Sequence, residues 1–154
     1  MRGITVQRWL MKTEPGTFSI DDLAARRTEP WDGVRNYQAR NFIRAMRRGD
    51  AVLIYHSACP QPGVAGTAKV GSAPRPDPTQ FDPASNHFDA ASCLDDPRWT
   101  LVDVRFVRKL ARVITLDEIK ALKALGDFAL TRRGNRLSVL PVTDQQWDAI
   151  LRLE

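Results

Sequence analysis

The chain has 154 residues, of which 43% are hydrophobic and 27% charged, and its formal net charge is +5. This length predicts a single domain over residues 1–154, with a core that needs neither a disulfide nor a metal. No segment approaches the roughly 18 apolar residues of a membrane span, and residues 1–8 lack the apolar core of a signal peptide. We therefore expect a protein that is neither secreted nor membrane-bound, cytoplasmic in a bacterium and nuclear in a eukaryote.

The charge is distributed unevenly along the chain. Residues 35–48 contain five arginines and no acidic residue, whereas residues 72–98 contain five aspartates and two arginines. A basic surface favours polyanionic partners such as nucleic acids. We expect one basic face and one acidic loop.

The two cysteines, Cys59 and Cys93, lack the spacing of a metal site. Structural zinc sites nearly always have two closely spaced pairs of ligands, and the nearest histidines here are His56 and His87. The four side chains could still converge in space. The spacing favours two isolated buried thiols, with no metal and no cofactor.

Four segments carry helix-start signals. In three of them, a capping hydroxyl is followed three residues later by an acid or an amide, between flanking apolar residues. The capping residues are Ser19, Thr115 and Thr143. A fourth helix is predicted after Asn36, because apolar residues recur there with a helical period until Gly49 ends the pattern.

Strand patterns fill much of the remaining sequence. Residues 52–55 are all apolar, which predicts a central strand, and residues 99–108 alternate with the period of a half-buried strand. Residues 132–136 have the composition of a basic hairpin turn. The expected strands are residues 8–12, 51–57, 64–70, 99–108, 110–114 and 136–139.

Short strands mixed with short helices predict an α+β fold. A small curved sheet or a barrel, with helices packed outside it, fits this pattern best. Residues 72–98 interrupt the pattern, since five prolines exclude a long helix or a central strand. A loop of this length is either functional, for example a lid, or a surface wrap, here anchored by Phe81, Phe88 and Trp99.

Residues 31–41 form the most distinctive segment, because they combine an indole, a phenol, amides and guanidinium groups. Aromatic faces stack on nucleobases, amides bond their edges and arginines contact the neighbouring phosphates. The segment therefore predicts a site for one nucleobase. A simpler interpretation also fits, in which Asn36 caps a helix, Trp31 and Tyr37 pack in the core and the arginines are solvated.

Several short motifs occur in order between residue 9 and about residue 151. They are WLMKTEP (9–15), FSIDDL (18–23), WDGVRNYQARNF (31–42), GD (49–50), YHS (55–57), GVAG (63–66), DPT (77–79), PRW (97–99) and RGNRLSV (133–139). Together they closely resemble the EVE domain family. The resemblance implies a PUA-like α+β fold, in which a strongly bent mixed sheet closes toward a barrel with short helices packed around it. This fold is related to that of the YTH readers of methylated adenine in RNA. It also implies a pocket for a modified base of DNA or RNA, with no catalysis assigned.

The same resemblance implies which residues form the site. Those expected to bind the base are Lys12, Thr13, Trp31, Asn36, Tyr37, Tyr55, His56, Ser57 and Trp99, where Trp99 either lines the cavity or pins the loop. The phosphate contacts are predicted from the basic residues themselves, because stacking of one base needs help from contacts to the backbone. They are Arg35, Arg40, Arg44, Arg132, Arg133 and Arg136. His87 lies in the proline-rich loop and is expected to be a free histidine.

The main functional hypothesis is a monomeric module that captures one flipped or unpaired, modified base of DNA or RNA. Two alternatives stay open. One is an enzyme acting on a nucleotide-derived substrate through Lys12 with Glu14, or His56 with Cys59, although no nucleophile, base and orienting group are apparent together. The other is an interaction module whose basic helix docks an acidic protein.

Overall fold

The structure is a computed structural model that describes residues 5–154; the expectation about the N-terminal segment falls partly on residues 1–4, outside this range. A six-stranded mixed sheet has the order β2-β7-β4-β3-β1-β8. Its strands are β1 (Arg8–Thr13), β2 (Thr28–Pro30), β3 (Ala51–His56), β4 (Gly63–Val70), β7 (Asp103–Thr115) and β8 (Val139–Val142), while β5 (Arg75–Pro76) pairs separately with β6 (Thr100–Leu101). The helices are α1 (Ile20–Arg26), α2 (Tyr37–Ala45), α3 (Leu116–Lys120) and α4 (Asp144–Leu151).

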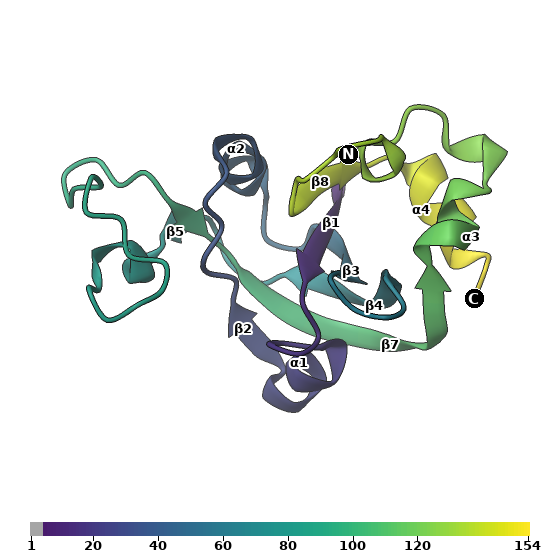
Figure 1. Ribbon diagram of the computed structural model, residues 1–154, viewed down its shortest axis with the longest axis horizontal. Coiled ribbons are helices and arrows are strands. Elements are labelled where there is room, and N and C mark those ends of the chain that lie inside the picture. Colours follow the sequence, from purple (N-terminus) through teal and green to yellow (C-terminus); the bar gives the residue numbers. More distant parts are fainter. Residues whose placement is uncertain (1–4) are drawn as a thin grey trace.

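The sheet curls into a half-barrel (Figure 1). β1 pairs with β3 in parallel, whereas the other neighbouring strands are antiparallel. The register between β4 and β7 shifts twice, and such bulges bend a strand. The expected bent, mixed α+β sheet is confirmed. The expected closure toward a barrel overstates the curvature, because β2 and β8 remain as edges.

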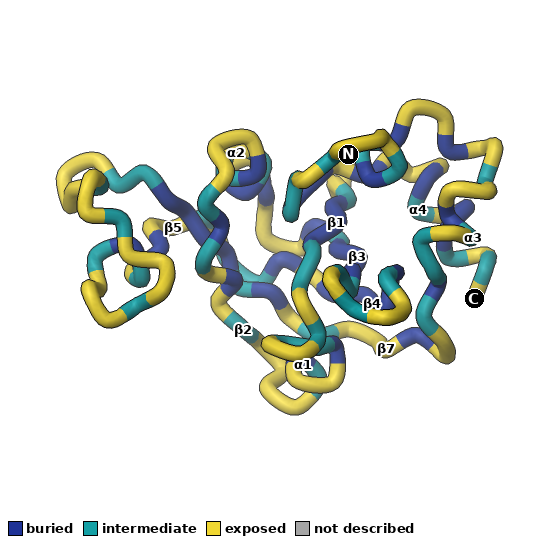
Figure 2. Tube along the Cα trace, viewed as in Figure 1, coloured by how far each residue is buried: buried dark blue, intermediate teal, exposed yellow. Residues whose placement is uncertain are grey.

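β3 lies inside the sheet, as its apolar run predicts. Alternation along the strand sends Val52 and Ile54 to one face and Leu53 and Tyr55 to the other. The first pair joins a core that α1 and α2 cover, and the second pair joins a core that α3 and α4 cover. Buried residues accordingly follow the sheet in Figure 2.

The capping signals mark the helix starts correctly. Ser19, Thr115 and Thr143 each form a complete capping box, and Asn36 Oδ1 accepts a hydrogen bond from the Ala39 N–H at 2.9 Å. These bonds satisfy donors that the first turn of a helix leaves unpaired. α2 ends at Ala45, before Gly49, because the next residue is extended.

The strands predicted at residues 99–108, 110–114 and 136–139 differ most from the structure. Residues 103–115 form one continuous strand, β7, because the register shifts bend the strand without ending it. Residues 132–136 do not connect two strands. They follow the 3-10 helix Ala129–Thr131 and lead into β8, which begins at Val139.

Residues 72–98 form a lobe that projects beyond the sheet, and much of its surface is exposed (Figures 1 and 2). Its main anchors are polar. Gln80 is fully buried, and its side-chain amide bonds the main chain of Asp77 and of Trp99 over 2.7–3.1 Å. Trp99 is buried, as an anchor should be, whereas Phe88 is 42% exposed and does not anchor the loop.

The thiols are not buried as expected. Cys93 is exposed and Cys59 is partly buried. Within residues 5–154, no three His, Cys, Asp or Glu side chains gather as a metal ion would require. No helix in the same range has the length and apolar character needed to cross a membrane.

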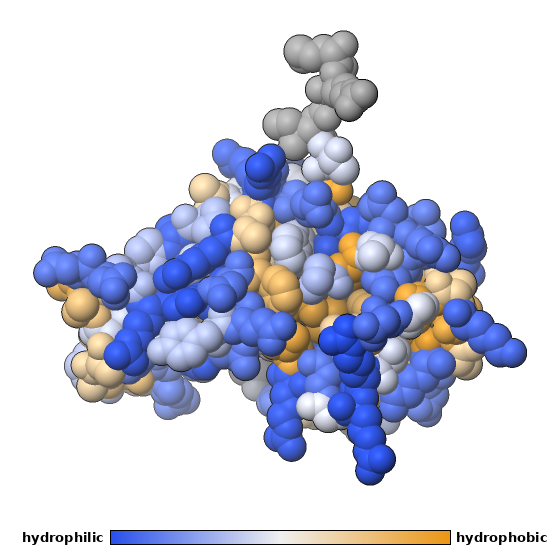
Figure 3. Space-filling view, turned by 90° about the horizontal axis from the view of Figure 1, so that it is seen from above, coloured by the Kyte–Doolittle hydropathy of each residue, from blue (hydrophilic) through white to orange (hydrophobic). Residues whose placement is uncertain are grey.

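The surface on the side of α2 and β8 is mixed in character. Hydrophilic side chains cover both flanks of this face, and an apolar band lies between them (Figure 3). Polar groups therefore border apolar ones across this face.

Gly66 lies where α1 packs against the sheet. A Cβ at this position would lie 2.6 Å from Ile20 Cγ1 and 2.8 Å from the Arg108 carbonyl oxygen. Because one of these neighbours is main chain, we expect Gly66→Ala to lower the free energy of unfolding by about 1–3 kcal/mol. Gly16→Ala is the control, since a Cβ there meets nothing within 4 Å. Chemical denaturation compares the two, and equal stabilities would contradict the prediction.

Candidate functional site

A pocket of about 590 Å³ opens between the end of β1, the start of α1 and the segment that joins β2 to α2. Its volume falls in the range of small-molecule sites. The lining residues are Lys12, Thr13, Thr17, Phe18, Arg26, Glu29, Pro30, Trp31, Asp32, Gly33, Val34, Arg35, Asn36, His87 and Ser138.

Two aromatic side chains form one wall of this pocket. Trp31 is 8% exposed, and Phe18 meets it edge to face with ring centroids 5.8 Å apart. The main-chain N–H of Trp31 donates to the Val102 carbonyl at 2.9 Å, and this bond ties the segment between β2 and α2 to the residue that precedes β7. This wall gives a planar ligand a rigid apolar surface.

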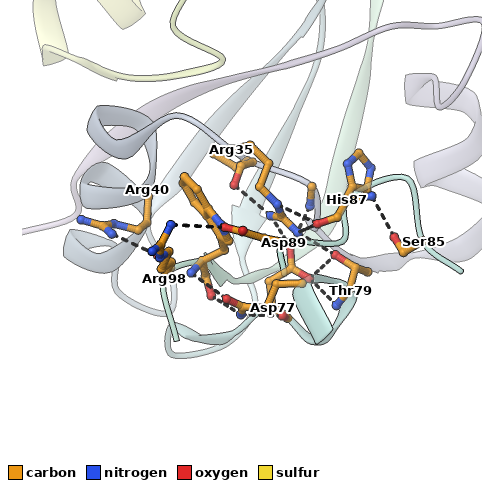
Figure 4. A network of polar contacts seen from close by, with 12 residues as sticks. Arg35, Arg40, Asp77, Thr79, Ser85, His87, Asp89 and Arg98 are labelled. Atoms are coloured by element: carbon orange, nitrogen blue, oxygen red, sulfur yellow. Dashed lines mark hydrogen bonds and ion pairs between the residues drawn. The ribbon is translucent and has the colours of Figure 1, made fainter. Parts of the chain in front are cut away.

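The buried Asp77 carboxylate holds the other end of the segment that joins β2 to α2, at Gly33 and Arg35. Asp77 is fully buried and accepts hydrogen bonds from the Gly33 N–H at 2.8 Å, from Arg35 Nη1 at 3.0 Å and from both the N–H and the hydroxyl of Thr79. Arg35 also donates to the His87 carbonyl at 2.7 and 3.0 Å (Figure 4). The lobe and the pocket segment are therefore fastened together.

The hydrogen bonds determine the charge state of Asp77. Burial by itself would raise the pKa of this carboxyl, but the bonds from Thr79, Gly33 and Arg35 outweigh burial and lower the pKa. Asp77 is thus an anion at neutral pH. We call Asp77, Arg35, Gly33, Thr79 and the His87 carbonyl the Asp77 clamp.

His87 is not the free loop histidine that the sequence suggested. It lines the pocket, and its ring packs on Gly33, where an added Cβ would lie 2.6 Å from His87 Nε2. Gly33 also has a φ of +84°, which few other residues adopt readily. The contact therefore requires glycine at this position.

Tyr37 does not line the pocket, contrary to the expectation that it binds the base, and Trp99 does not line it either. Their rings stack on each other with centroids 4.8 Å apart. The Trp99 indole N–H donates to Asp89 at 2.7 Å, and the Arg35 guanidinium lies 5.4 Å from the centre of the Trp99 ring. Trp99 therefore pins the lobe, which is one of the two roles considered for it.

Three further expected base-binding residues also lie outside the pocket lining. Tyr55 is buried in the core on the α3 and α4 side, and burial raises its pKa to about 12. His56 Nε2 accepts from the Ile20 N–H at 3.1 Å, and burial lowers the pKa of this histidine. Ser57 bonds the Thr13 carbonyl through its N–H at 2.9 Å. All three are fixed by internal contacts.

Lys12 and Thr13 line the pocket as expected, but their polar atoms face protein groups. The Lys12 ammonium lies 5.8 Å from the centre of the Tyr55 ring, and burial lowers the pKa of Lys12. The Thr13 hydroxyl donates to the Phe18 carbonyl at 2.7 Å. These two residues shape the pocket wall.

The arginines of α2 bind the lobe. Arg40 donates to the Arg98 carbonyl at 3.0 Å, and Arg44 donates to Thr100 Oγ1 at 3.0 Å and to the Pro97 carbonyl at 3.1 Å. With Arg35 in the Asp77 clamp, three of the expected phosphate ligands already bond the protein itself. Their sequence spacing along a helix did not reveal these partners.

The remaining three expected phosphate ligands lie in a second concavity of about 340 Å³. It is lined by Arg132, Arg133 and Arg136 together with Asn36, which also lines the first pocket. Arg132 forms an ion pair with Asp127 at 2.8 Å. Within residues 5–154, Arg133 and Arg136 make no ion pair, so their charges are not neutralised by a neighbouring carboxylate. Because Asn36 lines both concavities, this basic hollow adjoins the aromatic pocket.

Several pocket residues were not singled out from the sequence. In the sequence, Phe18 is only an apolar residue that flanks the Ser19 cap, and Asp32 and Gly33 have no role beyond their place in the motif of residues 31–42. Asp77 had a local signal, because an aspartate before a proline often caps a helical turn, and Asp77 does so for Thr79. The missed lining residues are Thr17, Phe18, Arg26, Glu29, Asp32 and Ser138, and Asp77 was missed as the residue that holds the pocket segment from outside the lining.

Removing the Asp77 carboxylate would leave a largely buried guanidinium and several N–H groups without their acceptor. We expect Asp77→Ala to lower the free energy of unfolding by about 3 kcal/mol. Asp95→Ala, an exposed residue of the same lobe, serves as the control. Urea denaturation measures both variants. A loss for Asp77→Ala no larger than that of the control would contradict the role of the clamp.

The lowered pKa of Asp77 also predicts a pH dependence. A carboxyl whose pKa is depressed on folding stabilises the protein above its unfolded pKa, and this contribution disappears as the pH falls through the folded pKa. The stability difference between the wild type and Asp77→Asn should therefore be full at neutral pH and shrink below about pH 4. Denaturation curves along a pH series measure it. A difference that stays constant down to strong acid would be inconsistent with an ionised clamp.

The chain is similar to several characterised sequences and solved structures. A sequence model of the EVE domain matches residues 7–153. Thymocyte nuclear protein 1 of Mus musculus is 47% identical, and the match covers 95% of this chain and 73% of the mouse protein. A crystal structure of a Pseudomonas putida protein shares 49% identity and a TM-score of 0.93, over 95% of this chain and 98% of that one.

A further relative was solved with nucleic acid. The crystal structure of human THYN1 protein in complex with 5-methylcytosine-containing DNA is 43% identical to this chain, with a TM-score of 0.90 and 96% of both chains covered. These similarities confirm the expected PUA-like fold. The chain belongs to the EVE domain family.

Proposed function

We propose that this protein captures a single modified base of DNA in the pocket beside Trp31. The observation that carries the proposal is the aromatic pocket of about 590 Å³, which adjoins a basic hollow. The human THYN1 protein, 43% identical, was solved in complex with DNA that contains 5-methylcytosine. This relative supports DNA as the nucleic acid and a methylated cytosine as the modified base.

Stacking alone is too weak to extract a base from a duplex. Flipping costs a few kcal/mol, and stacking on an aromatic side chain returns about 1–3 kcal/mol. The Trp31 indole and the Phe18 ring that supports it would supply the stacking surface. Contacts to the DNA backbone must therefore provide the rest of the binding free energy.

We assign the backbone contacts to Arg133 and Arg136. They line the hollow that shares Asn36 with the base pocket, so phosphates next to a bound base would lie within it. Arg35, Arg40 and Arg44 are not assigned to phosphate here, since their guanidinium groups bond the lobe. In this proposal the domain acts as a monomer.

The site geometry favours binding over the two alternatives. Neither Glu14, His56 nor Cys59 lines the pocket, and the His56 imidazole accepts a main-chain hydrogen bond. The Arg40 and Arg44 side chains of α2 are turned toward the lobe of the same chain, which leaves them unsuited to docking an acidic protein.

Two substitutions test the pocket. Trp31→Ala removes the stacking surface, and Ser138→Trp fills the cavity while the Ser138 main chain keeps its hydrogen bond to Lys12. We expect both to weaken binding to a short 5-methylcytosine-containing duplex at least tenfold. Phe88→Ala, an exposed aromatic residue outside the pocket, should leave binding unchanged.

Fluorescence anisotropy measures these affinities, and circular dichroism checks that each variant is folded. Methylated and unmethylated DNA and an RNA of equal length form the panel. Unchanged affinity of a folded Ser138→Trp variant would refute the pocket, and preferred binding to RNA would refute the assignment to DNA.

The basic hollow predicts how binding depends on salt. Each phosphate contact contributes about 0.9 to the log–log slope of affinity against salt concentration on duplex DNA. We expect Arg133→Ala and Arg136→Ala each to reduce the slope by about this amount. Arg152→Ala removes one charge outside both concavities and is the control. Slopes identical to that of the control would reject the hollow as the phosphate site.

A further inference from the structure

Asp32 differs from the other charged side chains of the pocket. Glu29 accepts from Arg26 at 3.1 and 3.3 Å, Arg35 belongs to the Asp77 clamp, and the Lys12 ammonium lies over Tyr55. The Asp32 carboxylate makes no hydrogen bond or ion pair with another side chain of residues 5–154. The one donor that the described part of the chain offers this carboxylate is the main-chain N–H of Asp32 itself. Because Asp32 is an exposed residue of the pocket lining, a ligand can reach the remaining acceptor positions of the carboxylate.

The main chain fixes the position of this carboxylate. The Asp32 N–H donates to the Pro30 carbonyl at 3.0 Å, and the next N–H, that of Gly33, is held by Asp77. Asp32 therefore sits between the Trp31 wall and the clamp. A ligand that stacks against Trp31 would present its edge close to this carboxylate.

The surroundings of Asp32 disfavour its negative charge. Partial desolvation, together with the nearby Asp77 carboxylate, raises the pKa of Asp32. The nearby His87 and Arg35 side chains act on the pKa in the opposite direction but do not outweigh burial and Asp77, and the Arg35 guanidinium itself bonds Asp77 and the His87 carbonyl. A ligand that donates a hydrogen bond to Asp32 would relieve this unfavourable environment.

We propose that Asp32 determines base specificity by accepting a hydrogen bond from the exocyclic 4-amino group of a cytosine-type base. This inference rests on the proposed function. Carboxylates accept from the cytosine 4-amino group, whereas a thymine or uracil presents a carbonyl oxygen at the same position. Asp32 and that oxygen would be two acceptors facing each other.

The comparison that matters is 5-methylcytosine against thymine. The two bases share the ring and the 5-methyl group, so the apolar wall cannot separate them, and they differ in the groups along the edge that Asp32 would meet. Sites that are built to hydrogen-bond a ligand reject an analogue that leaves a polar group unpaired. We expect the wild type to prefer 5-methylcytosine over thymine about tenfold or more.

The experiment uses two oligonucleotides that differ at one position, 5-methylcytosine or thymine. Each is placed opposite an abasic site, so that base pairing does not contribute to the difference. Affinities are measured for the wild type, Asp32→Asn, Asp32→Glu and Asp95→Asn. An asparagine amide both donates and accepts, so Asp32→Asn should bring the two affinities within about twofold. Asp32→Glu should keep the direction of the preference, and Asp95→Asn should keep the full ratio.

The outcomes separate this inference from the proposed function. Equal affinities in the wild type, or an unchanged ratio in folded Asp32→Asn, would overturn the role of Asp32 while Ser138→Trp still abolishes binding. Binding that survives Ser138→Trp would overturn the pocket itself, and with it the role of Asp32. If neither oligonucleotide binds to the wild type, the pocket and the role of Asp32 are likewise both overturned.

Discussion

The buried Asp77 carboxylate is the interaction on which the site depends. It joins segments more than forty residues apart, because Gly33 and Arg35 on one side and Thr79 on the other all donate to it. Without an anion at this point, several N–H groups and a guanidinium would be unsatisfied in a poorly hydrated place. The shape of the Trp31 pocket is therefore coupled to the packing of the lobe.

The same constraint explains how the basic charge is used. Arg35, Arg40 and Arg44 hold main-chain carbonyls and side chains of the lobe, so their charge serves the internal structure of the domain. The charge that remains available beside the pocket lies in the turn that carries Arg133 and Arg136. A count of arginines along the sequence gives the sign of the surface but does not distinguish these two groups.

Local patterns predicted the elements well, and long-range pairs limited the prediction of the site. The caps at Ser19 and Asn36 and the apolar run of β3 are read within a few residues, so the structure matches them. The partners of Arg40 and Arg44 lie more than fifty residues away. Tyr37 resembled a pocket aromatic for the same reason: nothing near it in the sequence indicates that it stacks on Trp99.

The most direct measurement is a crystal structure of this chain with a duplex that contains one 5-methylcytosine. The account predicts an extruded base against Trp31 and Phe18, with its 4-amino group toward Asp32 and the neighbouring phosphates beside Arg133 and Arg136. A base that remains stacked in the duplex, with the DNA lying on another face of the domain, would contradict it.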